Sequence, residues 1–378
     1  MANTRCDVII LGAGMAGASL AAELAGRCSV VLVETEDQPG RHATGRSAAM
    51  FFESYGNATI RALTRASRAF LEHPPAGFAA HALLTPRACL FVADAARRAG
   101  IDALLAAPDR SATLGPVSPA DAVAAVAILR PGWLAAAARD DSGHDIDVAA
   151  LHQGYLRQAR RGGVQLVVDA GEVRLARGGG LWEAVSRDVR VEAPVVVNAA
   201  GAWADEVAAR AGVAAVGLQP MRRSAMIIPA PAGLAVRDWP LVIDVDEKFY
   251  FKPDAGQLLL SPANEDPSPP CDAVPDEIDI ALAVDRFERA TTLPVTRVLH
   301  RWAGLRSFVA DRTPAVGFDP RADGFFWLAG QGGYGIQTAP AMARCAAALI
   351  SGERLPGEIE AEGVTAEALA PGRRALLR

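Results

Sequence analysis

The sequence predicts an α/β fold in which a parallel sheet is assembled from three separated segments, beside a second, α+β domain built on an antiparallel sheet. Three apolar runs, at 8–11, 194–198 and 325–329, carry this prediction, because each leads into glycines and then an alanine-rich helix. Uninterrupted apolar runs are typical of strands buried on both faces. Long stretches of other sequence separate the three units, so the parallel domain is expected to be discontinuous.

The first unit carries a glycine motif. Its strand is followed by Gly12-Ala13-Gly14-Met15-Ala16-Gly17, a helix to about residue 25, and an apolar strand that ends at Glu34. Glycines at these positions permit a tight turn, close approach of the backbone to a pyrophosphate, and close packing of the helix on the strand. The helix N-terminus then faces the phosphates, and the carboxylate hydrogen-bonds a ribose hydroxyl. The unit therefore predicts a Rossmann-like dinucleotide-binding domain.

The second and third units extend this domain. A helix is expected between an N-cap at Asp147 and a stop at Gly162-Gly163. Further elements are expected as strands at 164–168, 172–175, 181–185, 189–191 and 194–198, a helix near 202–211, and a last helix from near Gly335 to about 351. We therefore assign 1–50, 147–219 and 305–378 to the nucleotide-binding domain and 51–146 and 220–304 to the second domain.

Composition narrows the classes of function. Hydrophobic residues make up 51% and charged residues 21%, which indicates a folded chain. A net charge of −5 without a basic run argues against nucleic acid as a partner. The five cysteines lack CxxC spacing, so neither a disulfide framework nor a metal site is expected. No apolar run reaches the roughly 18 residues of a spanning helix. We expect a cytoplasmic protein, with peripheral association with the inner membrane left open.

Several longer runs are similar to one family of enzymes. Together with the glycine motif they resemble the D-amino-acid oxidase and glycine oxidase superfamily of FAD-dependent oxidoreductases over nearly the whole chain. Within it they look closest to the bacterial D-arginine dehydrogenase family. The runs that carry the resemblance are 44–49, 149–155, 197–203, 303–308 and 331–338.

The resemblance implies noncovalent FAD, held between a glutathione-reductase-like FAD-binding domain and the substrate domain. A helix that starts near Gly335 would direct its positive end at the flavin pyrimidine. The implied FAD-binding residues, including those of the glycine motif, are Gly12, Gly14, Met15, Ala16, Gly17, Glu34, Thr44, Gly45, Arg46, Ser47, Ala48, Ala200, Gly201, Gly330, Gly332, Gly333, Tyr334, Gly335, Ile336 and Gln337.

The resemblance also implies a site for a substrate carboxylate. Arg306 matches the family's substrate-binding arginine, and its guanidinium offers a bidentate fork that orients the substrate. Tyr250 would add a hydroxyl, although a buried core tyrosine is the alternative. Tyr55 corresponds to a family tyrosine on a loop that closes over the substrate, where a surface aromatic is the alternative.

The predicted side-chain pocket departs from the D-arginine dehydrogenase pattern. Cys89 replaces the glutamate that pairs with the substrate guanidinium, and the histidine and threonine of the pocket become Met50 and Phe52. Glu53 is new and would restore a cation site from another direction, where an exposed loop acid is the alternative. The remaining predicted lining residues are Leu241, Ile243, Gly333 and Tyr334. The pocket has lost a charge, so a neutral or apolar D-amino acid is expected rather than D-arginine.

The implied reaction is oxidative deamination. Hydride passes from Cα of the neutral amine to flavin N5, and the imino acid hydrolyses to a 2-oxo acid and ammonia. A quinone or another carrier would accept the electrons, and an oxidase that uses oxygen is the alternative. Oxidation of a secondary amine such as sarcosine, of glycine or of a cyclic imino acid also stays open. A flavin-binding protein without turnover and an RNA-modifying flavoenzyme are more remote alternatives.

Overall fold

The glycine motif lies at the centre of a six-stranded sheet. The computed structural model describes residues 4–108, 110–187 and 189–376. In the order β10-β3-β2-β14-β22-β21, all neighbouring strands of this sheet are parallel except β21 and β22. The strands are β2 (Val8–Leu11), β3 (Val30–Val33), β10 (Gln165–Val167), β14 (Val195–Asn198), β21 (Ala315–Phe318) and β22 (Phe325–Ala329). All three predicted segments therefore contribute to one sheet.

The central strands of this sheet are mostly apolar, and both faces of the sheet are covered. Val8 and Ile10 point to one face, where helices α1 (Met15–Leu24), α5 (Val148–Arg161) and α8 (Ala339–Ile350) pack. Ile9 and Leu11 point to the other, toward α6 (Ala204–Arg210) and a four-stranded sheet. That sheet has the order β1 (Thr4–Arg5), β13 (Arg190–Ala193), β12 (Leu181–Val185), β11 (Arg174–Gly178).

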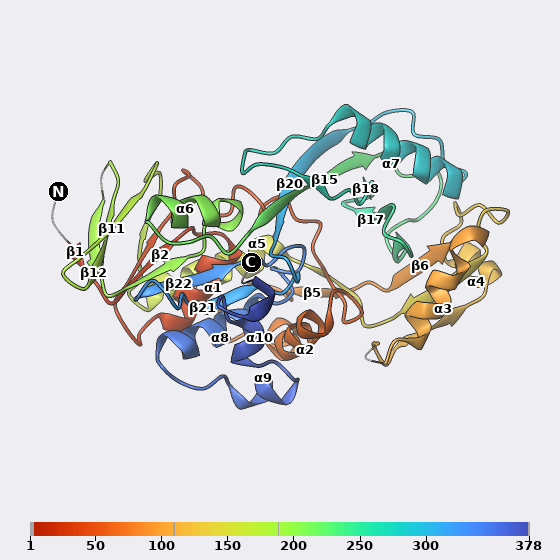
Figure 1. Ribbon diagram of the computed structural model, residues 1–378. Helices are drawn as coiled ribbons and strands as arrows, with labels where there is room; N and C mark the ends of the chain where they lie inside the picture. The colour runs from red at the N-terminus through yellow and green to blue at the C-terminus, as the bar shows by residue number, and fades with distance from the viewer. Residues whose placement is uncertain (1–3, 109, 188, 377–378) are drawn as a thin grey trace.

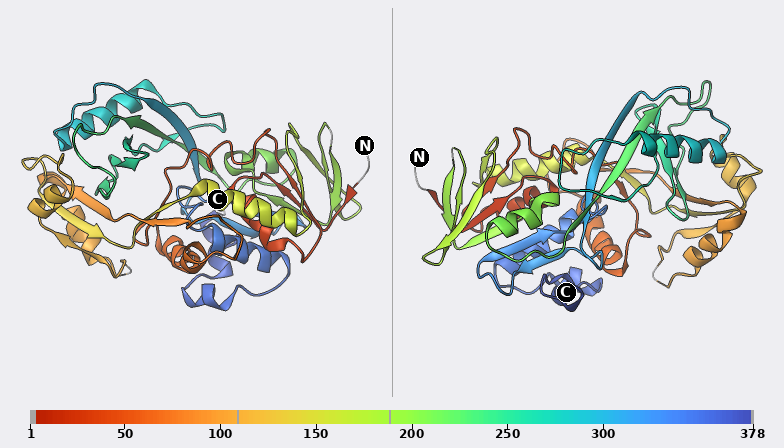
Figure 2. Two further views of the ribbon diagram at one scale, coloured as in Figure 1. Left: turned by 180° about the vertical axis from the view of Figure 1, so that it is seen from behind. Right: turned by 45° about the horizontal axis from the view of Figure 1, so that its top comes forward.

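A nine-stranded, mainly antiparallel sheet forms the other end of the molecule (Figures 1 and 2). Its strands are β6 (Cys89–Ala93), β7 (Leu114–Val117), β8 (Ala136–Asp140), β15 (Gln219–Ile228), β16 (Leu241–Asp244), β17 (Tyr250–Asp254), β18 (Gln257–Ser261), β19 (Asp266–Pro267) and β20 (His300–Phe308). The helices of this part are α3 (Arg98–Ala106), α4 (Pro119–Ala125) and α7 (Glu277–Ala290). This architecture confirms the predicted fold class.

Two long strands join the two ends of the molecule. Strands β15 and β20 pair from Gln219 opposite Phe308 to Ile227 opposite His300, and they extend from the nine-stranded sheet, to which they belong, toward the six-stranded one (Figure 1). The domain boundaries predicted after 219 and 304 fall inside this pair, and they stay a prediction.

A small sheet and helix α2 (Ala58–Glu72) lie where the two ends meet (Figure 1). The sheet has the order β4 (Met50–Phe51), β9 (His144–Ile146), β5 (Leu84–Pro86). The chain ends in α9 (Gly357–Ala361), α10 (Ala366–Leu369) and a 3-10 turn, Arg374–Leu376; two others are Ala95–Arg97 and Gly201–Trp203. Within the described residues, no helix combines the length and the apolar character needed to cross a bilayer.

Three expected elements differ in the structure. The helix expected from near Gly335, α8, begins at Ala339. Pro340 has no N–H to donate within a helix and is therefore accommodated only in its first turn. The helix expected near 202–211 starts as a 3-10 turn and is α-helical only over Ala204–Arg210. The strand expected at 172–175 lies at Arg174–Gly178, where it pairs with β12.

Candidate functional site

The glycine motif forms the turn between β2 and α1. Gly12 has a φ of 95°, and a Cβ there would lie 2.6 Å from the carbonyl oxygen of Ala199. A Cβ on Gly17 would lie 1.9 Å from the carbonyl oxygen of Gly12, so this glycine allows the helix to pack on the turn. Gly14 is the N-cap of α1 and offers no side-chain cap. No side chain of the N-cap residue therefore covers the first turn of α1, where an anionic ligand can bind, although the N–H of Met15 is bonded to Thr44.

Glu34 fixes this turn from the end of β3. Its carboxylate accepts hydrogen bonds from the N–H of Ala13 at 2.7 Å and the N–H of Glu36 at 3.0 Å. Burial raises the pKa of Glu34, and these hydrogen bonds oppose that shift only in part. Glu34 also lines the pocket that begins at the turn, where its remaining lone pairs can meet a ribose.

A pocket of about 560 Å³, here called the glycine-loop pocket, extends from this turn to Arg306. Thr44 crosses over the turn, and its hydroxyl accepts a hydrogen bond from the N–H of Met15 at 2.9 Å. Arg46 donates to the carbonyl oxygens of Ala273 at 2.9 Å and Ala303 at 3.1 Å, which holds the wall of the pocket together. The pocket thus reaches from the parallel sheet to strand β20.

Most predicted FAD-binding residues line the glycine-loop pocket. They are Gly12, Gly14, Met15, Ala16, Glu34, Thr44, Arg46, Ser47, Ala48, Ala200, Gly201, Gly332, Gly333, Gly335 and Ile336. Lining residues that the sequence analysis did not single out include Glu36, Arg41, His42, Trp203, Cys271 and Trp302. A single polar or aromatic residue gave no signal of its own, because the segments that carry these residues meet only in the fold.

Five predicted FAD-binding residues lie outside this lining, for identifiable reasons. Gly17 packs on the turn, and the N–H of Gly45 closes a local turn by bonding the carbonyl oxygen of Gly40. Gly330 packs beside Val309 and Pro314. Gln337 is buried and donates to the Thr64 hydroxyl at 2.8 Å, and Tyr334 lies in a different pocket.

The three predicted substrate-binding residues come together at the end of the glycine-loop pocket. The Arg306 guanidinium donates to the Tyr55 hydroxyl at 3.1 Å, and Tyr250 lines the pocket beside it. Gly333 leaves room for this group, because a Cβ there would lie 2.9 Å from Arg306 Nη1. Burial acts to lower the pKa of Arg306, but the facing oxygens of Tyr55, Tyr250 and Glu247 outweigh it and raise that pKa. The guanidinium is therefore a fixed positive charge.

Arg223 is a second buried cation here, and the sequence analysis did not single it out. Arg306 lies opposite Met221, two residues before Arg223 on β15, so both arginines lie on one face of the strand pair. Only 7% of Arg223 is exposed, and burial together with the charge of Arg306 lowers its pKa. Its Nη2 lies 3.2 Å from the Glu265 carboxylate. Two guanidinium groups thus face one space, which suits an anion.

The predicted side-chain pocket is an apolar cluster. Phe52, Cys89, Leu241 and Ile243 are all less than 10% exposed, and Met50, Tyr55 and Tyr250 pack against them. Burial raises the pKa of the Cys89 thiol well above its usual range, so this residue is a neutral sulfur. This group of residues, here called the apolar cluster, adjoins the Arg306 site through Tyr55 and Tyr250.

Glu53 does not belong to the apolar cluster. Its carboxylate pairs with Arg68 of α2 at 2.8 Å, and Arg68 in turn pairs with Glu72 at 2.8 Å and lies over the Phe51 ring. Glu53 is thus paired with a cation of α2, and its alternative role as a cation site stays a prediction.

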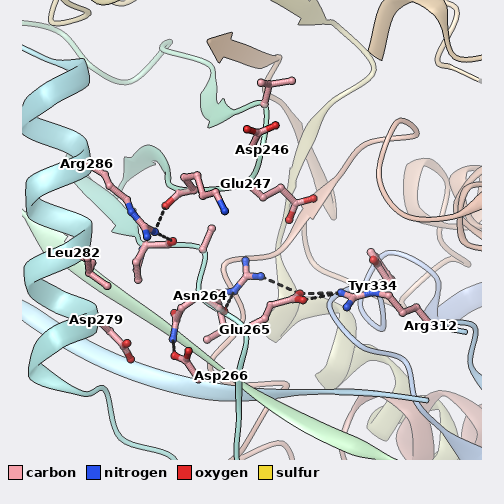
Figure 3. Close-up of a pocket in the computed structure, with 15 residues that line it drawn as sticks. Asp246, Glu247, Asn264, Glu265, Asp266, Asp279, Leu282, Arg286, Arg312 and Tyr334 are labelled. Carbon is pink, nitrogen blue, oxygen red and sulfur yellow. Dashed lines mark hydrogen bonds and ion pairs between the residues drawn. The ribbon is translucent and has the colours of Figure 1, made fainter. Parts of the chain in front are cut away.

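A second pocket, of about 670 Å³ and called here the polar pocket, shares Arg223 with the first (Figure 3). Figure 3 shows Glu265 facing Arg312, with Tyr334 beside them. Arg312 Nη2 contacts both carboxylate oxygens of Glu265, at 2.9 and 3.0 Å. Burial acts to raise the pKa of Glu265, but these arginines outweigh it and lower that pKa. Glu265 therefore carries a negative charge between Arg223 and Arg312.

The donor set fits a dinucleotide and offers no metal site. The N-terminus of α1 at Gly14, the tight turn at Gly12 and the Glu34 carboxylate all lie at the glycine-loop pocket, and Gly17 packs α1 on that turn. Among the described residues, no group of three or more His, Cys, Asp or Glu side chains could hold a metal ion. The fold and this pocket define a dinucleotide-dependent oxidoreductase.

The chain belongs to the DAO family of FAD-dependent oxidoreductases, whose family model matches residues 7–349. FAD is therefore its cofactor, as the sequence analysis expected. Similar solved structures include glycine oxidase from Geobacillus kaustophilus (TM-score 0.80, 21% identity, 93% of this chain and 96% of that one). L-proline dehydrogenase from P. horikoshii has a TM-score of 0.80 at 21% identity, covering 94% and 96%. These likenesses show the fold.

Two curated relatives are similar in sequence. FAD-dependent oxidoreductase domain-containing protein 1 of Xenopus laevis is 28% identical over 42% of this chain and 35% of its own length. The tRNA 5-methylaminomethyl-2-thiouridine biosynthesis bifunctional protein MnmC of Burkholderia mallei is 28% identical over 98% of this chain. The match covers 59% of MnmC, so this chain spans less than two thirds of either relative. The closer likeness to the D-arginine dehydrogenase family stays a prediction.

Cys271 provides a test of the glycine-loop pocket. It is partly buried and lines the pocket, whereas Cys28 is partly buried elsewhere. We expect a thiol-alkylating reagent to modify Cys271 more slowly in the FAD-bound protein than after FAD removal, and Cys28 equally in both. Burial, which raises the pKa of Cys345 to about 12, keeps that thiol unreactive in either form. Peptide mass spectrometry measures this, and equal rates at Cys271 would place FAD elsewhere.

Proposed function

We propose that this chain oxidises the carbon–nitrogen bond of a free D-amino acid with a neutral or apolar side chain. One observation carries the proposal: the partly buried guanidinium of Arg306 meets the Tyr55 hydroxyl at the end of the glycine-loop pocket, beside Tyr250 and Arg223. Two cations and two hydroxyls around one space suit a carboxylate. The apolar cluster next to that space suits the side chain of the same molecule.

Each residue has a separate role in this proposal. Arg306 and Arg223 bind the carboxylate, and the hydroxyls of Tyr55 and Tyr250 donate to it. Holding the carboxylate fixes the orientation of Cα, which lowers the entropic part of the barrier. Tyr55 also covers the site, since its ring stacks on Phe52 at 4.9 Å. Bound FAD supplies the acceptor for two electrons. Among these four residues the arginines are already protonated and the tyrosines act as hydrogen-bond donors, so none of them is expected to take a proton from the substrate. The amine is therefore expected to react in its neutral form.

The apolar cluster supports a neutral side chain. Burying a Leu-, Met- or Phe-sized side chain contributes about 1.5–3 kcal/mol. A guanidinium or ammonium group would be desolvated there, because Cys89 offers no charge and Glu53 is paired with Arg68. Asp140 and Asp145 lie near Cys89, but the Asp140 carboxylate already accepts hydrogen bonds from hydroxyls and the Asp145 carboxylate already pairs with two cations. The cluster thus favours D-Leu, D-Met or D-Phe over D-Arg.

Anaerobic reduction of bound FAD tests the proposal. Neutral D-amino acids are expected to bleach the oxidised flavin rapidly, L-enantiomers and D-Arg slowly, and air to restore the colour slowly if the enzyme is a dehydrogenase. Faster bleaching by D-Arg or D-Lys than by D-Leu would contradict the neutral pocket. Bleaching by sarcosine or proline alone would shift the proposal to secondary amines, the substrates of similar folds such as L-proline dehydrogenase.

The match to MnmC raises tRNA modification as a second candidate. The match extends over 98% of this chain, but a net charge of −5 does not favour binding to the phosphates of a nucleic acid. The residues at the Arg306 site are buried or partly buried, which favours a free small molecule. Unchanged bleaching rates in the presence of excess tRNA are expected.

A further inference from the structure

The segment 50–57, which carries Tyr55, is held at several places, among them the ion pair of Glu53 with Arg68 and the hydrogen bond that Phe52 N–H donates to Gln337 at 3.4 Å. At its start, β4 pairs with β9. At its end, Asn57 caps α2 by accepting the N–H of Ile60 at 3.0 Å. Between these anchors, the hydroxyl of Ser54 donates to the carboxylate of Asp140 on β8. The middle contact adjoins Tyr55 directly, so it bears on where the Tyr55 hydroxyl lies.

Asp140 is fully buried and yet charged. Its carboxylate accepts hydrogen bonds from the hydroxyls of Ser111 at 3.0 Å and Thr113 at 2.7 Å, from the N–H of Ser142 at 2.9 Å, and from Ser54. Burial acts to raise the pKa of Asp140, but these hydrogen bonds outweigh it and lower that pKa. Three of the donors come from the neighbouring strand regions, whereas Ser54 alone of the four comes from the Tyr55 segment.

Asp140 lies on the wall of the apolar cluster. It pairs directly with Cys89 of β6 and with Leu114 of β7, and residues opposite each other in a sheet share a face. Cys89 belongs to the apolar cluster, and Leu114 is buried against the same group of residues. A carboxylate on such a face needs every donor it can reach. The segment that supplies Ser54 is therefore favoured in the position that satisfies Asp140, and in that position Tyr55 meets Arg306.

We propose that Asp140 is a positioning residue which, through Ser54, holds the 50–57 segment where the Tyr55 hydroxyl reaches Arg306 and the substrate carboxylate. This inference rests on the proposed role of Arg306 as the carboxylate site. Asp140 touches neither the substrate nor FAD in this scheme. It acts on binding by fixing the closed position of the segment.

The test uses the FAD-bound protein and benzoate, a carboxylate with an apolar ring. Loss of one hydrogen bond to a charged group is expected to weaken benzoate binding about tenfold in Ser54→Ala, measured from the absorbance of bound FAD. Hydrogen exchange in residues 50–57 is expected to rise. Ser54→Thr keeps a hydroxyl and is expected to bind as the wild type does. Thr113→Ala removes a hydroxyl from the same carboxylate outside the segment, and is expected to change benzoate affinity less than about twofold.

A double-mutant cycle separates positioning from a general structural effect. If Ser54 acts through the Tyr55 hydroxyl, Ser54→Ala is expected to add little in a Tyr55→Phe background. Additive effects, equal losses in Thr113→Ala and Ser54→Ala, or no benzoate binding to the wild type would overturn the inference. Neither binding nor exchange requires turnover. A protein that binds benzoate as expected and that no amino acid reduces would therefore defeat the proposed function and leave this inference standing.

Discussion

Arg306→Ala is expected to lower kcat/KM for the best D-amino acid by about 30- to 5000-fold. The variant loses the guanidinium that would pair with the substrate carboxylate, and removing one partner of such a charge pair costs about 2–5 kcal/mol. The guanidinium lies with its Nη1 3.1 Å from the Tyr55 hydroxyl and beside Gly333, where no side chain competes for the space. Both kcat and KM should change, since the carboxylate contact also orients Cα. Steady-state kinetics with an artificial electron acceptor measures this.

A matched control lies on the same strand. Arg301 of β20 is exposed and pairs with Glu277 at 2.7 Å, so Arg301→Ala is expected to change kcat/KM little. Arg306→Lys keeps a charge without the bidentate fork and should fall between the wild type and Arg306→Ala. Activity of Arg306→Ala within a few-fold of the wild type would show that the carboxylate binds elsewhere, for instance at Arg223 alone.

Local signals explain what the sequence predicted well. The turn at Gly12 and the carboxylate at Glu34 are set by backbone geometry within one strand–turn–helix unit, so spacing alone indicates them. The helix after Asp147 is predicted in the same way, because each of its ends is set by an adjacent residue, Asp147 at the start and Gly162 at the end. Resemblance to a family added Arg306, Tyr250 and Tyr55, whose positions the local pattern does not fix.

Contacts between distant segments explain what the sequence missed. Arg223 joins the site because β15 pairs with β20 in one register, and a shift by one residue would turn its side chain to the other face. Gln337 lies outside the lining of the glycine-loop pocket, and its side-chain amide donates a hydrogen bond to Thr64, which is far away in sequence. Glu53 is drawn to Arg68 in the same way. The position of each of these side chains depends on a partner residue that the local sequence pattern does not predict.

Gly14→Ala is expected to weaken FAD binding by about 10²- to 10⁴-fold, which corresponds to losing two hydrogen bonds to a charged group at about 1.5–3 kcal/mol each. Gly14 begins α1 at the place where backbone N–H groups would meet the pyrophosphate. An added Cβ would stand in that space, yet it would meet only the Thr44 hydroxyl, at 3.3 Å. The backbone at Gly14, with φ −68° and ψ −172°, also suits alanine.

Because Gly14→Ala clashes with little else, the variant should fold, and its loss should appear in FAD binding alone. Titration of FAD into the FAD-free protein, followed by flavin fluorescence, measures the affinity, and thermal unfolding of the FAD-free protein checks the fold. Gly132→Ala is the control, since a Cβ there meets nothing within 4 Å. By contrast, Gly17→Ala would clash within the protein itself and destabilise both forms. Wild-type affinity in Gly14→Ala would mean that the phosphates do not approach the first turn of α1, and the glycine motif would then serve packing only.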